Sequence, residues 1–439
     1  MLKAQNRLGI IFFPAYDWAI SPTHPEREER LLYTQDQLRE EGLFDIEGIT
    51  EHKPDIATAK DIERVHFCFP DVSEVTTKSH FISAGGAIRA GRLVMEGTED
   101  KAFAMVRPPG HHAMKCVHGN RGFCNINIEA IMIEHIRANY GHKRVAVVDT
   151  DCHHGDGSQD VFWHDPDTLF ISLHQDGRTL YPGTGFPQEL GGPNAFGKTI
   201  NIPLPPNTSD EGFLYVIENV VKPLLDDFKP DLVINSAGQD NHFTDPITNM
   251  NFSAQGYAKL NELVNPDIAV LEGGYSIQGA LPYVNLGICL AMAGADYSGV
   301  REPNYDPDQL RQPAKVTDYI KDLSDSIREL YFDPPRGNIE GRLVNGMYVR
   351  DKSIFYDTDG INENQVESIT KCDDCPGVLK IESRSTVNPL SVGIQIPRNC
   401  CPKCYAKAMQ MWEDAQIKGN YRYLKLINLK DDDIQSFGF

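Results

Sequence analysis

Short runs of apolar and β-branched residues alternate along this chain with longer stretches that have the composition of helices. Helices are expected over residues 126–139 and 208–228, and Pro223 should kink or split the second one because proline cannot donate the helical hydrogen bond. Strands are expected at residues 102–106, 144–148, 168–173, 231–235 and 267–271. Strands that alternate with helices form a parallel sheet whose faces the helices cover. The pattern therefore predicts a three-layer α/β fold with a mostly parallel central sheet.

The alternating pattern stops after about residue 310. One further helix is expected over residues 316–331, and residues 333–337, Asp-Pro-Pro-Arg-Gly, have the composition of a linker. A cluster of cysteines follows. We therefore predict a large first domain over residues 1–331, a linker over 332–345 and a small second region over 346–439.

Polar residues follow four of the expected strands at the point where each strand ends. These polar clusters are residues 107–113, 149–157, 236–240 and 272–275. The carboxyl ends of parallel strands meet at one edge of a sheet, where ligand crevices form in open α/β folds. We therefore expect the four clusters to converge on one site.

The second cluster places Asp151 and His153 two residues apart. In an extended segment such side chains point the same way, so a carboxylate and an imidazole can hold one ion. Asp240, at the end of a later strand, supplies a third ligand. Three protein ligands with an open position for water are typical of catalytic zinc, although iron(II), manganese and cobalt accept the same ligands.

Two adjacent histidines, His111 and His112, follow a Pro-Pro-Gly segment that forms a stiff loop. Asp149 and Asp156 flank the metal pair and are placed to orient one imidazole ring each. A carboxylate on one ring nitrogen fixes the tautomer and raises the basicity of the ring, as a general base requires. Tyr275, in a Gly-Gly-Tyr turn, is suited to donate its hydroxyl group to a substrate carbonyl oxygen on which charge develops.

Charge and hydropathy restrict the partners and the location. The formal charge of -20 repels nucleic-acid phosphates and favours basic partners such as lysine-rich tails or polyamines. The apolar stretch at residues 8–13 is too short for a secretory signal, and no run of about 18 apolar residues occurs. We expect a soluble intracellular protein that binds neither nucleic acid nor membrane. It is expected to be cytoplasmic by default, and the sequence leaves a nuclear or host-delivered location open. The sequence leaves its oligomeric state open.

Two Cys-x-x-Cys pairs lie near the end of the chain, Cys372 with Cys375 and Cys401 with Cys404, with 25 residues between them. Paired cysteines at this spacing are compatible with a second, structural zinc ion in a zinc-ribbon-like region. A site that uses Cys400 in place of Cys401, or a set of free thiols, is also compatible with the sequence.

Several segments share their order and spacing with one known family. They are His24-Pro25-Glu26, residues 107–112 (Arg-Pro-Pro-Gly-His-His), 149–157, 181–185 (Tyr-Pro-Gly-Thr-Gly), 237–240 with Asp245-Pro246, and 272–275 (Glu-Gly-Gly-Tyr). Through them the chain resembles the histone deacetylase family, especially its class II and bacterial members, within the wider arginase and deacetylase fold. The resemblance covers roughly residues 8–300.

The resemblance implies roles for the residues that match the motifs. The zinc ligands are matched by Asp151, His153 and Asp240. The general-base pair is matched by His112 with Asp156, and the second histidine pair by His111 with Asp149. The tyrosine that polarises the substrate carbonyl group is matched by Tyr275.

Two further sites follow from the resemblance alone. The tunnel that accepts the lysine side chain is matched by Gly122, Phe123, Tyr181 and Gly273. A monovalent-cation site, usually potassium, is matched by Ser172 and Leu173 with backbone carbonyl groups of the loop that includes Asp149, Asp151 and His153. A cation beside several aspartates would offset their repulsion.

The implied reaction is zinc-dependent hydrolysis of the acetyl amide of N-acetyl-lysine in proteins or peptides such as histone tails, which would make the chain a chromatin regulator. An acetylpolyamine amidohydrolase shares the zinc site, but such enzymes place an acidic residue soon after the Asp-Pro pair, where this chain has Ile247. A weakly active acetyl-lysine binding scaffold would not need His111, His112 and Tyr275. A two-manganese arginase would want a carboxylate where His242 stands.

Overall fold

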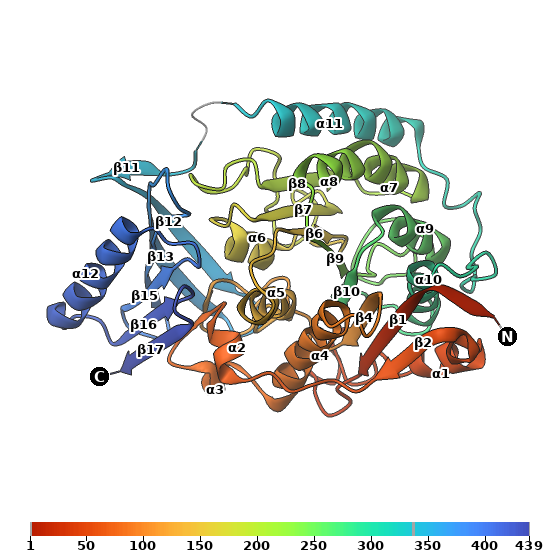
Figure 1. Cartoon of the computed structure of the whole chain (residues 1–439). Coiled ribbons are helices and arrows are strands. Elements are labelled where there is room, and N and C mark those ends of the chain that lie inside the picture. Colours follow the sequence, from red (N-terminus) through yellow and green to blue (C-terminus); the bar gives the residue numbers. More distant parts are fainter. Residues whose placement is uncertain (1, 336–338, 439) are drawn as a thin grey trace.

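The computed structural model describes residues 2–335 and 339–438, and its largest feature is an eight-stranded sheet (Figure 1). The spatial order of the strands is β2-β1-β4-β10-β9-β6-β7-β8, and each neighbouring pair is parallel. The strands are β1 (Lys3–Phe13), β2 (Glu47–His52), β4 (Lys101–Val106), β6 (Val145–Asp149), β7 (Thr168–Gln175), β8 (Thr199–Leu204), β9 (Leu232–Ala237) and β10 (Ile268–Leu271). The predicted parallel sheet is confirmed.

Helices cover both faces of this sheet. Along β4, Phe103 and Met105 belong to one buried apolar cluster and Ala102, Ala104 and Val106 to another, because alternate side chains of a strand point to opposite faces. The first cluster includes residues of α1 (Thr34–Glu40), α7 (Asp210–Val216), α8 (Lys222–Phe228), α9 (Ala254–Val264), α10 (Leu281–Ala293) and α11 (Ala314–Phe332). The second includes residues of α2 (Ala59–Glu63), α3 (Val72–Val75), α4 (Lys78–Met95) and α5 (Ile128–Asn139). The result is the predicted three-layer arrangement.

The expected elements agree closely with those observed. The five predicted strands correspond to β4, β6, β7, β9 and β10, with ends that differ by at most two residues. The long helix expected over residues 208–228 is interrupted by a π-helical turn at Ile217–Val221, directly before α8, which carries Pro223 in its first turn. The hydrophobic pattern did not identify β1, β2 and β8 as strands.

The second region contains a separate seven-stranded sheet with the order β11-β12-β13-β14-β15-β16-β17. Its elements are β11 (Arg342–Val344), β12 (Met347–Tyr356), β13 (Ile361–Thr370), β14 (Leu379–Ser385), β15 (Ser391–Ile396), α12 (Pro402–Lys418), β16 (Tyr423–Asn428) and β17 (Asp433–Gly438). Neighbouring strands are antiparallel except β15 and β16. The predicted linker overlaps the end of α11 and all of β11, and its residues 336–338 lie outside the described residues.

This C-terminal sheet packs against the first domain beside α2 and α3 (Figure 1). Phe67 and Phe69, at the two-stranded sheet of β3 (Phe67–Cys68) and β5 (Cys116–Val117), share an apolar cluster with Ile369 and Ile381. A second shared cluster is formed by Met114, Ile354, Tyr356 and Ile361. The strand ends on both sides of the turn between β12 and β13 are thereby held against the segment that precedes β5.

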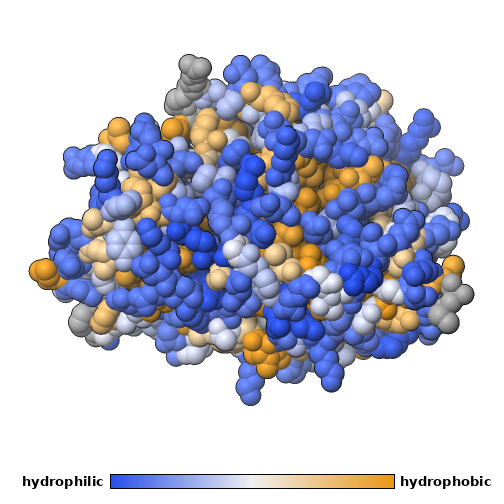
Figure 2. All heavy atoms as spheres, viewed as in Figure 1, coloured by the Kyte–Doolittle hydropathy of each residue, from blue (hydrophilic) through white to orange (hydrophobic). Residues whose placement is uncertain are grey.

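The face of the molecule drawn in Figure 2 is covered mainly by hydrophilic residues, with apolar residues in smaller patches between them. Within residues 2–335 and 339–438, no helix has the length and apolar character needed to cross a membrane.

Candidate active site

The four polar clusters converge at one edge of the central sheet, as expected. They follow the carboxyl ends of β4, β10, β9 and β6, which are consecutive neighbours in the sheet. Segments that are more than 100 residues apart in the sequence therefore meet around one point, where a pocket of the kind found in open α/β folds can form.

The structure brings together Asp151, His153 and Asp240, the predicted ligands. Each offers one ligand atom, and the three atoms lie within 4.8 Å of one another. His153 Nδ1 lies 2.9 Å from Asp240 Oδ2 and 3.2 Å from Asp151 Oδ1, and all three side chains are buried. Burial and the neighbouring Asp151 carboxylate raise the pKa of Asp240. A cation would relieve this repulsion, and two carboxylates with one imidazole fit zinc.

Two glycines permit the close approach of these ligands. A Cβ atom on Gly238 would lie 2.1 Å from Asp151 Oδ2, and one on Gly273 would lie 2.4 Å from Asp240 Oδ2. The backbone N–H of Gly273 also donates a hydrogen bond of 2.7 Å to Asp151 Oδ2. We expected Gly273 in the tunnel wall, and the structure places it against the ligand carboxylates.

The two adjacent histidines are oriented by different carboxylates. His111 Nδ1 lies 3.1 Å from Asp149 Oδ2, and His112 Nδ1 lies 2.8 Å from Asp156 Oδ1. Burial opposes charge on both rings, but Asp151 and Asp149 raise the pKa of His111 well above 6.5. Burial and the neighbouring His111 lower the pKa of His112 to about 4, despite the hydrogen bond with Asp156. His112 is therefore neutral near pH 7 and able to accept a proton.

Tyr275 is held by its backbone and by buried charged groups around its turn. Its N–H donates to Asp245 Oδ2 at 2.8 Å. Arg30 donates to the carbonyl oxygen of Gly274 at 2.8 Å and to that of Glu272, and its guanidinium group lies 5.0 Å from the centre of the Tyr275 ring. Burial raises the pKa of Tyr275 well above 10, so its hydroxyl group keeps its proton and can donate.

A pocket with a volume of about 320 Å³ reaches this centre from the surface. Its walls are formed by His111, His112, Gly122, Phe123, His153, Leu180, Tyr181, Ile247, Tyr275 and Asp357. Phe123 stands at right angles to Tyr275, with 5.6 Å between the ring centres, and Tyr181 stands similarly to His112 at 5.2 Å. Three of the four predicted tunnel residues thus line one largely apolar pocket.

Comparison with known proteins decides the family. Residues 70–285 match the family described as Histone deacetylase domain. A protein from Archaeoglobus fulgidus named Probable deacetylase is 46% identical over 331 residues, which cover 69% of this chain and 91% of the relative. The chain belongs to the histone deacetylase family. Membership makes it an amidohydrolase of the deacetylase class.

Other relatives of this deacetylase carry different names. Histone deacetylase-like amidohydrolase from Pseudomonas aeruginosa is 34% identical and covers 53% of this chain and 62% of the relative. Acetylpolyamine amidohydrolase from Burkholderia pseudomallei is 36% identical, and the match covers 47% of this chain and 60% of the relative. The crystal structure of the HDA15 HD domain matches with a TM-score of 0.64 at 24% identity, covers 75% of this chain and 97% of that one, and supports the fold.

Sequence reasoning gave no role to several buried residues that shape the deacetylase site. Glu26 lies between Arg30 at 2.9 Å and Arg107 at 2.7 Å, and all three side chains are buried. Glu272 accepts hydrogen bonds from the backbone N–H groups of Gly110 and His111. The motifs contained Glu26, Arg107 and Glu272 without indicating these contacts, and the sequence pattern had no signal for Arg30.

The predicted monovalent-cation site lies between neighbouring strands of the deacetylase domain. Asp149 at the end of β6 pairs with Ser172 of β7, and Ser172 Oγ lies 2.9 Å from His174 Nδ1. Leu173 is buried. Potassium at this place stays a prediction.

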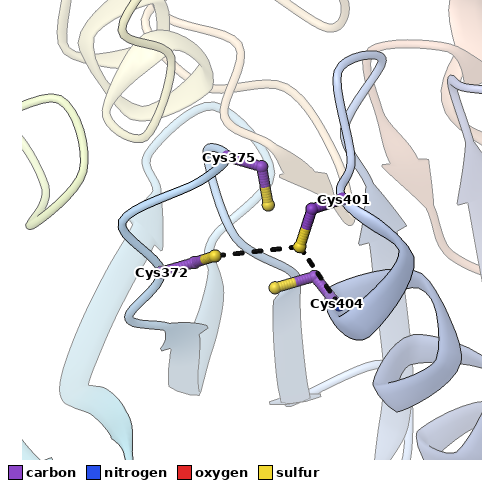
Figure 3. Close-up of side chains that lie close together, drawn as sticks. All are labelled: Cys372, Cys375, Cys401 and Cys404. Carbon is purple, nitrogen blue, oxygen red and sulfur yellow. Dashed lines mark hydrogen bonds between the residues drawn. The ribbon is translucent and has the colours of Figure 1, made fainter.

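The C-terminal cysteines form a second cluster, outside the residues that match the deacetylase family (Figure 3). The Sγ atoms of Cys372, Cys375, Cys401 and Cys404 lie within 4.8 Å of one another. The Cys372 and Cys401 sulfur atoms are 3.8 Å apart. Tetrahedral zinc with Zn–S bonds of about 2.3 Å requires a sulfur separation of about 3.8 Å, so the four thiols fit a zinc ion. Cys400 instead donates its thiol to the carbonyl oxygen of Cys401.

Proposed function

We propose that this chain is a zinc-dependent deacetylase that hydrolyses the acetyl amide of N-acetyl-lysine in proteins. One observation carries the proposal: a largely apolar pocket leads to His153 of the predicted ligand set, with His112 and Tyr275 on its walls. Phe123 and Tyr181 supply apolar surface suited to the methylene stem of a lysine side chain.

Zinc bound by Asp151, His153 and Asp240 would supply a Lewis acid and would lower the pKa of water. His112 then accepts the proton of the attacking water at Nε2, because Asp156 holds its Nδ1–H at 2.8 Å. The hydroxyl group of Tyr275 donates to the carbonyl oxygen as negative charge develops there. His112 returns the proton to the leaving amine, and lysine and acetate are released.

A scaffold that only binds acetyl-lysine has less support. The neutral His112 beside its Asp156 partner and the protonated Tyr275 both face the pocket, where they serve a reaction. Binding alone would require neither a proton acceptor nor an oxyanion donor.

An acetylpolyamine is the second candidate substrate, and one observation favours it. We expected no acidic partner for a distal ammonium group because Ile247 follows the Asp-Pro pair. Asp357, from the C-terminal sheet, lines the same pocket as Ile247 and supplies such a partner. The residue at 247 alone therefore does not separate the two substrate classes.

A substrate panel tests the proposal. The zinc-loaded protein is assayed with acetyl-lysine peptides, N-acetylputrescine and N8-acetylspermidine under the same conditions. We expect a higher kcat/KM for the peptides. Turnover of the polyamines alone would overturn the choice of substrate, and turnover of none would overturn the proposed activity.

For the C-terminal region we propose a structural zinc ion bound by Cys372, Cys375, Cys401 and Cys404. The spacing of the sulfur atoms supports it, as does the position of the cluster, which joins the segment after β13 to the start of α12. Four thiolates leave no open position, which is typical of a structural site.

A further inference from the structure

The C-terminal sheet contributes one side chain to the pocket. Asp357 lies in the turn between β12 and β13. Among the residues that line the pocket, it is the one that belongs to the C-terminal region. The other lining residues belong to the first domain. The mouth of the deacetylase pocket is thus completed by a part of the chain that lies outside the residues matching the family.

The turn that carries Asp357 is fixed in place by neighbouring contacts. Tyr356 is buried, and its hydroxyl group donates to the carbonyl oxygen of Cys116 at 2.9 Å. Asp359 accepts a hydrogen bond of 2.6 Å from the backbone N–H of Asn120. A Cβ atom on Gly119 would lie 2.5 Å from Asp359 Oδ2, so the two segments pack without a gap. Asp357 therefore has a defined position at the mouth.

The two oxygens of the Asp357 carboxylate have different surroundings. Oδ1 accepts hydrogen bonds from the backbone N–H of Gly122 at 3.0 Å and from the hydroxyl group of Tyr181 at 2.9 Å. Within residues 2–335 and 339–438, no hydrogen bond ends on Oδ2 and no ion pair includes Asp357. The nearby Arg121 lies 2.6 Å from Asp156 and is engaged there. Oδ2 is left as an acceptor at the mouth of a pocket with apolar walls.

We propose that Asp357 is a substrate-binding residue whose Oδ2 accepts a hydrogen bond from the N–H group that the substrate carries where its alkyl stem leaves the pocket. The inference rests on the proposed function, because the acetamide end must be at the zinc site. The donor is a backbone amide N–H in an acetyl-lysine peptide and an ammonium N–H in an acetylpolyamine. Both place an N–H donor at the end of an apolar stem.

The Asp357→Asn variant separates substrate binding from a structural role. Asparagine keeps an oxygen that can accept from Gly122 and Tyr181, so the pocket keeps its shape. Its NH₂ group replaces Oδ2, so a donor faces the substrate donor. Asp351→Asn is the matched control, because Asp351 lies on β12, the strand that leads into the turn with Asp357, and pairs with Arg342 on the surface.

The experiment compares kcat/KM of the zinc-loaded proteins for four substrates. Two carry the N–H donor, an acetyl-lysine peptide and N8-acetylspermidine. Two lack it. One is the same peptide methylated at the backbone amide nitrogen of its acetyl-lysine, and the other is N-pentylacetamide, which has no N–H beyond its acetamide. We expect Asp357→Asn to lower kcat/KM for at least one donor substrate roughly 10- to 100-fold, the range for a hydrogen bond to a charged group. For N-pentylacetamide, kcat/KM should change less than about 2-fold.

The outcome also identifies the donor. A loss with the peptide alone assigns the backbone amide, and a loss with N8-acetylspermidine alone assigns the ammonium group. An equal loss with all four substrates, or no loss with any, would overturn the proposal. If the wild-type protein turns over none of them, the proposed function fails, and calorimetric affinities for the same four compounds then test Asp357 by the same comparison.

Discussion

At the scale of single residues, two adjacent histidines differ because their carboxylate neighbours differ. His111 faces Asp149 and Asp151, which favour its charged form, whereas His112 has Asp156 as its partner and a charged ring beside it. The ring centres are 4.1 Å apart, so one positive charge disfavours a second. A cation at Asp151 would reduce the field that charges His111. The neutral ring is the one suited to proton transfer.

Tyr275→Phe should lower kcat by about 10²-fold or more, because it removes one donor to the developing oxyanion. The ring stays between Phe123 and Arg30, and the metal ligands are unchanged. We therefore expect the zinc content, measured by mass spectrometry, to equal that of the wild-type protein. Tyr297→Phe is the control, since this hydroxyl group donates to Glu262 on the surface. Wild-type turnover in Tyr275→Phe would exclude Tyr275 from the reaction.

Residues that act through local spacing could be predicted, and those that act across the fold could not. Asp151 and His153 lie two residues apart and meet in any extended segment. Arg30 contacts Glu272, 242 residues later, and Asp357 contacts Gly122, 235 residues earlier. Such contacts depend on how separate elements pack, so no pattern near Arg30 or Asp357 indicated them.

At the scale of elements, strands buried on both faces were predictable where they form continuous apolar runs. β8 is buried along its whole length but was missed, because Asn201 and Pro203 interrupt its apolar run. β4, β6 and β10 are buried along their whole length. β1 begins with exposed residues, and β2, at the edge of the sheet, has a single buried residue among its six, so their patterns are weaker. The order of the strands also required the structure, since β10 lies between β4 and β9.

One buried histidine links three elements and makes their packing sensitive to acid. His66, next to β3, donates from Nδ1 to the carbonyl oxygen of Met114 at 2.8 Å, and its Nε2 accepts from the N–H of Asn127, the N-cap residue of α5, at 2.9 Å. Only the neutral ring can do both. Burial lowers the pKa of His66 to about 3 from an ordinary value of 6.5.

The sign of the pH effect follows from this lowered pKa. Below pH 6.5 the unfolded chain binds a proton at His66 that the folded chain excludes until about pH 3, so stability is lost as the pH falls through this window. The free energy of unfolding falls by up to about 1.4 kcal/mol per pH unit within this window. His66→Gln keeps a donor and an acceptor but cannot ionise. Urea unfolding between pH 7.5 and 4.5 should show a smaller loss for His66→Gln, and equal losses would contradict the assignment.

At the scale of the whole molecule, the C-terminal sheet packs against the first domain and also lines part of the pocket. It shares apolar clusters with the first domain and carries Asp357 to the mouth. The cysteine spacing predicted a metal cluster in this region but could not predict seven strands or their position. The apolar residues of this sheet that meet Phe67 and Phe69 are separated from them by about 300 residues. The pocket of the deacetylase is therefore lined by both parts of the chain.

The two proposed zinc sites should be separable by substitution. Metal analysis of the wild-type protein should give about two zinc ions per chain, one in the four-cysteine set and one in the catalytic ligand set. The double variant Cys372→Ser/Cys375→Ser should keep one zinc ion and its deacetylase turnover, because the ligands of the remaining site are in the first domain. Its melting temperature should fall, because a structural metal contributes to folding stability.

Substitution in the other site should give the opposite result. Asp240→Asn should keep the zinc ion of the cysteine cluster and lose turnover, since it weakens the catalytic ligand set. Cys400→Ser is the matched control for the cysteine cluster: its thiol lies outside the four-sulfur set and contacts the Cys401 carbonyl group, so both zinc ions should remain. A single zinc ion in the wild-type chain that Asp240→Asn removes, or loss of zinc from Cys400→Ser, would refute the proposed four-cysteine site, because either result means that these four sulfur atoms do not hold a metal ion together.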